Sequence, residues 1–113
     1  KAQVDTALSD KANKAVSMID GTYLVTVGSN KALKIIEDDM TICVSGYFQS
    51  NQAISANTNI CNVGKNLKYS MYFTGYIGST IIPMVLTDNG NVYATVAISN
   101  GQWVNFSCIG YKA

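Results

Sequence analysis

The side chains best suited to chemistry in this sequence are a single tryptophan and the neutral polar residues around it. Trp103 follows the Asn100-Gly101 pair, at the start of an expected strand. In that position its indole can stack on the face of a sugar ring, while amides and hydroxyls hydrogen-bond to sugar hydroxyls. The alternative is that Trp103 caps the hydrophobic core. The sequence leaves both interpretations open.

Four further residues join Trp103 as candidate ligand-binding residues. Tyr76 and Tyr93 fall on or near the polar faces of expected strands, and Asn57 lies in a polar, loop-like stretch. Asp88 belongs to an Asp-Asn-Gly sequence, which is also ordinary turn chemistry. Packing, chain connection and turn formation are therefore the alternatives for these four residues.

The inventory of side chains argues against catalysis. The chain contains no histidine, so Ser-His-Asp triads, Cys-His pairs and histidine-containing zinc sites are excluded. Glu37, Asp38 and Asp39 could form a glycosidase pair or a Ca²⁺ site. Neighbouring residues in a tight turn point in different directions, however, and a solvated hairpin turn explains these acids better. We expect no enzymatic activity, no cofactor and no metal.

Charge and hydropathy exclude other classes of partner. The net charge is +1, and after Asp39 the ionic residues are Lys65, Lys68, Asp88 and Lys112. Nucleic acid is not expected, because phosphate binding needs clustered basic residues. Membrane insertion is not expected either, because no apolar run approaches the roughly 20 residues that span a bilayer.

The three cysteines each lie in or beside an apolar run, where a small thiol packs well. They are Cys43, Cys61 and Cys108. We expect reduced thiols within the core rather than disulfides. The absence of an initiator Met fits an excised C-terminal fragment.

The first 20 residues have a helical pattern. Val4, Leu8, Lys11, Ala15 and Met18 follow a 4-3-4-3 spacing, which is close to the heptad of a coiled coil. A helix of this length with such a thin apolar stripe is marginal alone, so it needs partners. The pattern favours the end of a parallel coiled-coil stalk over residues 1–20. The alternative is an arm that packs on its own domain.

From residue 21 the apolar period becomes two, which is typical of half-buried strands. These residues, 21–113, are expected to form one all-β domain, an antiparallel β-sandwich or jelly roll. The last three strands are predicted to form a meander, because Asn-Gly supplies a tight hairpin turn. Pro83 places its strand at a sheet edge or at a strand start. The expected strands are 23–27, 33–36, 40–49, 68–74, 81–86, 92–98 and 103–109.

Three segments together resemble a known family. The start contains VDTALSDKAN, the first expected hairpin reads KIIEDDMTICVSGYFQ, and the closing strands read GNVYATVAISNGQWVNFSCIGY. The pattern extends over nearly the whole chain and resembles the head domain of the receptor-binding proteins of phages that infect lactococci and related Gram-positive bacteria.

The resemblance implies a homotrimer with a helical neck and β-sandwich heads, located at the phage tail tip or baseplate beside other tail proteins. It implies binding of a bacterial cell-wall polysaccharide for host recognition. In such heads a Trp with His, Asp or Arg lines sites near or between subunits. This chain has no His or Arg, so Trp103 and Asp88 are the residues carried over. Lys65 and Lys68 are the basic candidates for a phosphorylated receptor.

Two other classes remain open. One is a structural trimerisation or baseplate module of a phage tail that binds no ligand, which needs the same stalk and large buried interfaces. The other is a trimeric lectin-like or tumour-necrosis-factor-like domain from a bacterium or host. If Trp103→Ala leaves adsorption to cells unchanged while it destabilises the trimer, the structural module is favoured.

Overall fold

The structure is a computed structural model that describes residues 17–113. Most of the stalk expected over residues 1–20 lies outside the described residues. Residues 17–20 form a strand whose register pairs Ser17 with Glu37 and Asp20 with Lys34. The prediction of a helix reaching residue 20 is therefore wrong at its C-terminal end, where sheet pairing replaces helical spacing.

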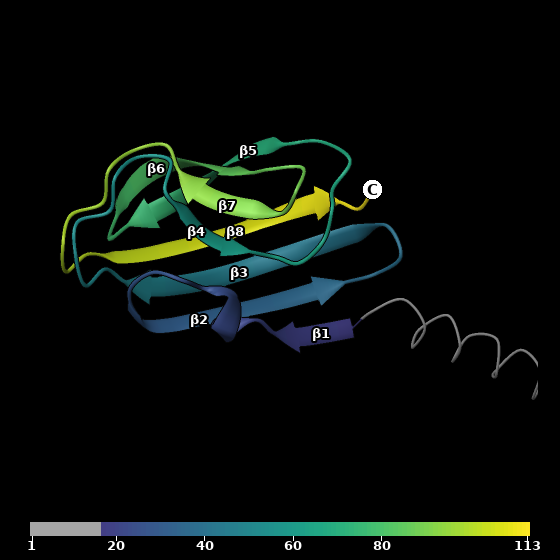
Figure 1. Ribbon diagram of the computed structural model, residues 1–113, viewed down its shortest axis with the longest axis horizontal. Coiled ribbons are helices and arrows are strands. Elements are labelled where there is room, and N and C mark those ends of the chain that lie inside the picture. Colours follow the sequence, from purple (N-terminus) through teal and green to yellow (C-terminus); the bar gives the residue numbers. More distant parts are fainter. Residues whose placement is uncertain (1–16) are drawn as a thin grey trace, which may run out of the picture.

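The described residues confirm the all-β class with antiparallel pairing. They form one 8-stranded antiparallel sheet in the order β1-β2-β3-β8-β5-β6-β7-β4 (Figure 1). A short 3-10 turn, η1, links the first two strands. The elements are β1 (Ser17–Asp20), η1 (Thr22–Leu24), β2 (Ser29–Glu37), β3 (Thr41–Gln49), β4 (Asn59–Asn62), β5 (Met71–Ile77), β6 (Thr80–Leu86), β7 (Asn91–Ala94) and β8 (Trp103–Tyr111).

The sheet curls until its two ends meet. The Thr26 amide donates to the carbonyl of Ile60 at 2.9 Å, and Val25 forms a bridge with Cys61. These contacts join the segment before β2 to β4, the last strand in the sheet order. One face of the sheet is thereby enclosed, and the other faces outward along the whole domain.

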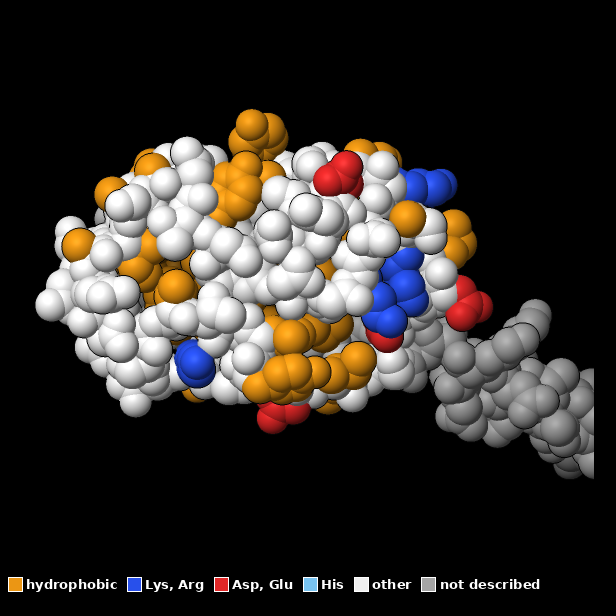
Figure 2. Space-filling model, in the orientation of Figure 1, with side chains coloured by type: hydrophobic (Ala, Val, Ile, Leu, Met, Phe, Trp, Pro, Cys, Tyr) orange, Lys and Arg blue, Asp and Glu red, His pale blue; other side chains and the backbone are white. Residues whose placement is uncertain are grey.

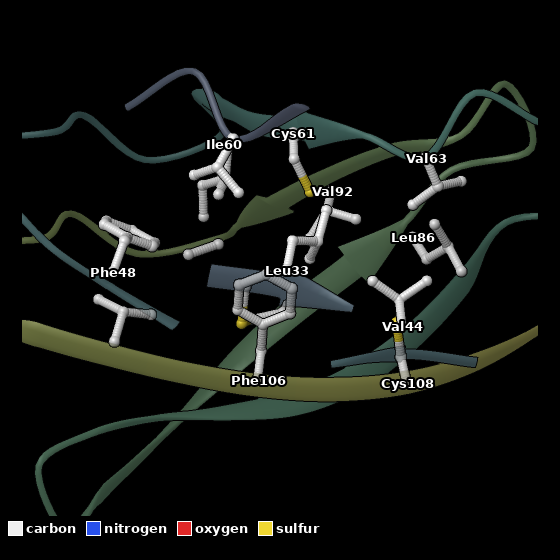
Figure 3. Close-up of a cluster of buried hydrophobic side chains, with 14 of the residues drawn as sticks. Leu33, Val44, Phe48, Ile60, Cys61, Val63, Leu86, Val92, Phe106 and Cys108 are labelled. Atoms are coloured by element: carbon white, nitrogen blue, oxygen red, sulfur yellow. The ribbon is translucent and has the colours of Figure 1, made fainter. Parts of the chain in front are cut away.

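The enclosed face is the hydrophobic core. Residues in β8 alternate strictly between exposed and buried, as expected for a strand with one face on a core. Figure 3 shows Phe48, Leu33 and Phe106, which come from three different strands, among the buried side chains of this core. The completely buried members with the largest side chains include Phe48, Leu33, Ile35, Ile42, Ile60, Met84, Leu86 and Ile98.

Gly46 shows how tightly this core is packed. It occupies an inward position of β3, between Val44 and Phe48. A Cβ on Gly46 would lie 2.8 Å from Leu33 Cδ1 and 2.9 Å from Phe106 Cζ. The space that a side chain would need is therefore filled by Leu33 and Phe106.

The predicted meander of the last three strands is wrong. The β6–β7 hairpin forms, and Gly90 has the positive φ of 88° that its turn requires. β7 ends at Ala94, however, and the chain then crosses the domain so that β8 pairs with β3 and β5. Long-range pairing of β8 with two strands outweighs the local hairpin signal of Asn100-Gly101.

Pro83 does not place its strand at an edge, because β6 lies between β5 and β7. The backbone N and carbonyl O of one strand residue point to the same neighbour. The carbonyl of Pro83 accepts from the Thr95 amide at 3.0 Å. The side of Pro83 that lacks an N–H therefore faces the segment just after β7. The absence of this donor costs no hydrogen bond between β6 and β5.

The three cysteines are free thiols. Cys61 and Cys108 are core residues, and burial raises the pKa of each thiol to about 12. Cys43 is instead half-buried on the outward side of β3. The expectation of core thiols is therefore met by two of the three residues.

The three neighbouring acids do not converge on one site. Glu37 lies 3.4 Å from the Lys112 ammonium and 3.8 Å from that of Lys65. Asp38 accepts hydrogen bonds from the amides of Met40 and Thr41, and these bonds lower the pKa of its carboxyl. The acids thus hold the β2–β3 turn and close the adjacent end of the domain.

We predict that Gly46→Val destabilises the domain by about 1–3 kcal/mol, because the added side chain overpacks the core against Leu33 and Phe106. Ser45→Val is the matched control, since Ser45 is the exposed neighbour on the same strand. Urea unfolding measures both variants. Equal stability of the two variants would contradict the packing described here.

We also predict an acid-sensitive junction at β1. Hydrogen bonds from Thr22, together with Lys34, lower the pKa of Asp20 from 3.8 to about 2. The ionised Asp20 carboxylate therefore stabilises the folded β1 above pH 3.8, and this stabilisation is lost as the pH falls through about 2. The protection factors of the β1 amides, which are exchange rates corrected for the intrinsic effect of pH, should therefore fall over this range, and Asp20→Asn should show low protection throughout. Unchanged exchange in Asp20→Asn would contradict the prediction.

Candidate functional site

An open, shallow pocket lies on the outward face of the sheet, where β8 runs between β3 and β5. Its volume is about 360 Å³, which is near the lower limit of ligand-binding clefts, about 300–1,000 Å³. The lining residues come from these three strands and are Ser45, Gly46, Thr74, Tyr76, Asn105, Phe106 and Ser107.

Strand register brings the polar side chains of the pocket together. Asn105 is the cross-strand partner of Tyr47 on one side and of Tyr76 on the other. Ser45 is the partner of Ser107 in the next outward row. Directly paired side chains lie about 4.5–5.5 Å apart at Cβ, so each row presents its polar groups side by side.

The pocket offers uncharged hydrogen-bonding groups. Ser45, Thr74 and Ser107 supply hydroxyls, Asn105 supplies an amide, and Tyr76 supplies a phenol. Within residues 17–113 these side chains form no hydrogen bonds with one another or with the backbone. Their donors and acceptors are therefore available to a ligand that carries hydroxyl or amide groups.

An aromatic pair borders the pocket at the start of β8. The rings of Tyr47 and Trp103 lie 6.1 Å apart between centroids and are tilted by 56°. Trp103 is 44% exposed, while its neighbour Val104 points into the core. The interpretation of Trp103 as a core cap is therefore wrong, and its indole faces outward beside Tyr47.

Charged groups are sparse near the pocket. Lys34 is the β2 partner of Ser45, and its ammonium lies 3.2 Å from the Asp20 carboxylate, so its charge is already paired. On the face shown in Figure 2, acidic and basic side chains gather mostly toward the end that holds the C terminus (Figure 1). Lys68, one basic candidate for a phosphorylated receptor, bonds through its amide to Tyr111 at that end of β8.

The structure brings Tyr76 and Trp103 to one surface but separates Asp88 from them. The Asp88 carbonyl accepts from the amide of Leu67, which bridges Lys112 just beyond β8. Trp103 stands at the other end of this 9-residue strand, about 27 Å away at 3.4 Å per residue. A single small-ligand site cannot include both residues.

Tyr93 and Asn57 also lie away from the pocket. Tyr93 is in β7, between Val85 and Asn59 in the sheet register. The Asn57 amide donates to the carbonyl of Ala94 at 2.8 Å. These two residues therefore share the β4–β7 side of the domain, and β5 and β6 separate them from β8.

Ser45, Thr74, Asn105 and Ser107 line the pocket although they were not predicted from the sequence as site residues. The alternation of β8 does indicate that Asn105 and Ser107 share the outward face with Trp103. It does not indicate which strands flank β8. The missing information was the pairing of β8 with β3 and β5.

No model of a protein family matches the chain, and no curated protein matches it either. Within residues 17–113 no group of three His, Cys, Asp or Glu side chains could hold a metal ion. In the same part of the chain, no helix has the length and apolar character needed to cross a membrane.

We predict that Tyr47 and Trp103 stabilise each other by about 0.5–1 kcal/mol, as tilted aromatic pairs do. A double-mutant cycle with Tyr47→Ala, Trp103→Ala and the double variant, followed by urea unfolding, measures this coupling. Strictly additive effects would show that the two rings do not form a pair in solution.

Proposed function

We propose that this chain is a host-recognition module of a phage tail that binds a bacterial cell-surface saccharide. In this proposal the chain is the receptor-binding head of a homotrimer at the tail tip or baseplate, attached to other tail proteins. It acts by adhesion, without catalysis and without a cofactor. The family resemblance of the sequence suggests this role, and the outward pocket supplies a surface suited to it.

The observation that carries the proposal is the uncharged pocket beside an aromatic pair. A saccharide needs hydroxyl and amide partners for its own hydroxyls, and an aromatic surface for the apolar face of its ring. Ser45, Thr74 and Asn105 belong to the first class, and Tyr76 and Trp103 to the second. Nucleic acids, by contrast, need clustered positive charge, which the pocket lacks.

A site of this kind binds weakly by itself, because it is open and has no ionic contact. Linking several sites raises the effective concentration of the second and third contacts. A repetitive wall polysaccharide and a trimer of heads would therefore give stable adhesion from weak individual sites. The proposal thus requires both self-association and an intact pocket.

A structural module of the phage tail is the second candidate. Exposed apolar side chains outside the pocket favour it, among them Met18 and Ile109, because such residues are typical of protein contacts. In that case the trimer would join other tail proteins and bind no saccharide. Cell binding separates the two candidates.

We predict that Tyr76→Ala lowers binding of the labelled chain to lactococcal or other Gram-positive cells by about tenfold or more, since it removes a ring and a phenol from the pocket. Tyr72→Ala is the matched control. Tyr72 is another exposed tyrosine of β5, but it does not line the pocket. Flow cytometry against a panel of cells, with purified wall polysaccharide as competitor, measures the effect.

Equal binding by the Tyr76→Ala and Tyr72→Ala variants would remove the pocket from the proposal. Absence of binding to every cell type by the unmodified chain would favour the structural module instead. The oligomeric mass of each variant is measured in parallel, so that loss of the pocket is not confused with loss of the assembly.

A further inference from the structure

An apolar row crosses four strands on the outward face of the sheet. Met18 of β1 is the partner of Ile36 in β2, Ile36 is the partner of Cys43 in β3, and Cys43 is the partner of Ile109 in β8. Adjacent strands are about 4.8 Å apart, so these four side chains are consecutive neighbours. We call them the apolar row.

The apolar row is exposed although its members are typical core residues. Met18 is 69% exposed and Ile109 is 56% exposed. Tyr111 extends the surface, since it follows Ile109 by two residues on the same side of β8, and its ring lies 6.0 Å from that of Tyr69. Clustered apolar groups of this kind are typical of protein contact sites, whereas single exposed residues are not.

The next outward row has the opposite character. It consists of Asp20, Lys34, Ser45 and Ser107, which are consecutive partners in the same four strands. This polar row lies between the apolar row and the aromatic and amide residues of the pocket. Contact confined to the apolar row therefore leaves Tyr76 and Asn105 open.

We propose that the apolar row is the surface on which a second copy of this chain packs. The outward residues of β3 and β8 are uncharged, so the row offers no partner for a strongly charged macromolecule. It also offers few hydrogen-bonding groups for a glycan. The same row on a second copy is equally apolar, so the two rows can bury each other's side chains.

Charge beside the row is also compatible with a second copy. The Lys34–Asp20 pair stands next to the row and is exposed at both partners. Each copy therefore presents one positive and one negative group at the border of the contact. The two charges neutralise each other within each copy, so contact at the row leaves no net charge to neutralise.

The position of the row along the chain supports the same partner. Val4, Leu8 and Ala15 have the spacing of a self-associating heptad, and only three positions separate Ala15 from Met18. Three residues span at most about 11 Å. Copies joined through the heptad pattern would therefore keep their β1 strands, and with them the apolar rows, close to the shared axis.

The test compares Ile109→Lys with Ile81→Lys in the full 113-residue chain, by sedimentation velocity over a concentration series. Ile81 is a matched control, because it is an isoleucine of the same sheet with 62% exposure and lies outside the row. We expect the unmodified chain and Ile81→Lys to associate equally. Ile109→Lys should raise the dissociation constant by about 100-fold or more, because it would bury an unpaired charge.

The alkylation rate of Cys43 in the native protein is a second measurement of the same contact. Cys43 is part of the row, while Cys61 and Cys108 are buried, with thiol pKa values of about 12 that keep them unreactive. Cys43 should react at least about tenfold faster in the unmodified chain diluted below its dissociation constant than in the same chain when associated. Circular dichroism confirms that each variant is folded.

Three results would overturn the inference. These are a monomeric unmodified chain at all concentrations, undiminished association of Ile109→Lys, or equal dissociation of both lysine variants. The inference does not depend on saccharide binding, because mass and thiol reactivity are measured without any glycan. The inference rests on the proposed function only for the assembly: loss of saccharide binding alone would leave it unaffected, whereas a monomeric chain would remove the homotrimer from both.

Discussion

The insertion of β8 between β3 and β5 is the constraint on which the rest of the domain depends. This strand joins the β1–β3 part of the sheet to the β5–β7 part, and its inward residues Val104, Phe106 and Cys108 contribute to the core. Its outward residues pass through the middle of the exposed face. Because side chains alternate along a strand, the register that fills the core also fixes what that face presents.

The outward side of β8 therefore changes in character along its length. Trp103 and Asn105 contribute to the aromatic and pocket region, Ser107 belongs to the polar row, and Ile109 belongs to the apolar row. The proposed saccharide site and the proposed subunit contact are thus neighbours on one surface. A separation of two residues along a strand, about 6.8 Å, is enough to keep their chemistry distinct.

Local patterns in the sequence predicted the all-β class and the hairpin of β2 and β3, but they left open whether Trp103 faces outward or caps the core. They failed where distant pairing decided the structure. The Asn100-Gly101 signal is equally compatible with a tight hairpin and with a crossover, and sequence spacing does not show which strands flank β8. The pocket was missed for that reason, whereas Tyr76 was identified from its polar-face position. Asp88 was a turn residue, as its Asp-Asn-Gly context allowed.

Saccharide binding by the outward pocket is tested most directly by an NMR titration of the isotopically labelled chain. The chain is titrated with soluble fragments of wall polysaccharide. The fragments are prepared from those Gram-positive cells to which the chain binds. We predict chemical-shift changes centred on Ser45, Thr74, Asn105 and Ser107, with a change at the Trp103 indole N–H. Changes centred on Asn57 and the β4–β7 side would contradict saccharide binding by the pocket. So would the absence of any change at fragment concentrations that fully inhibit binding of the chain to cells.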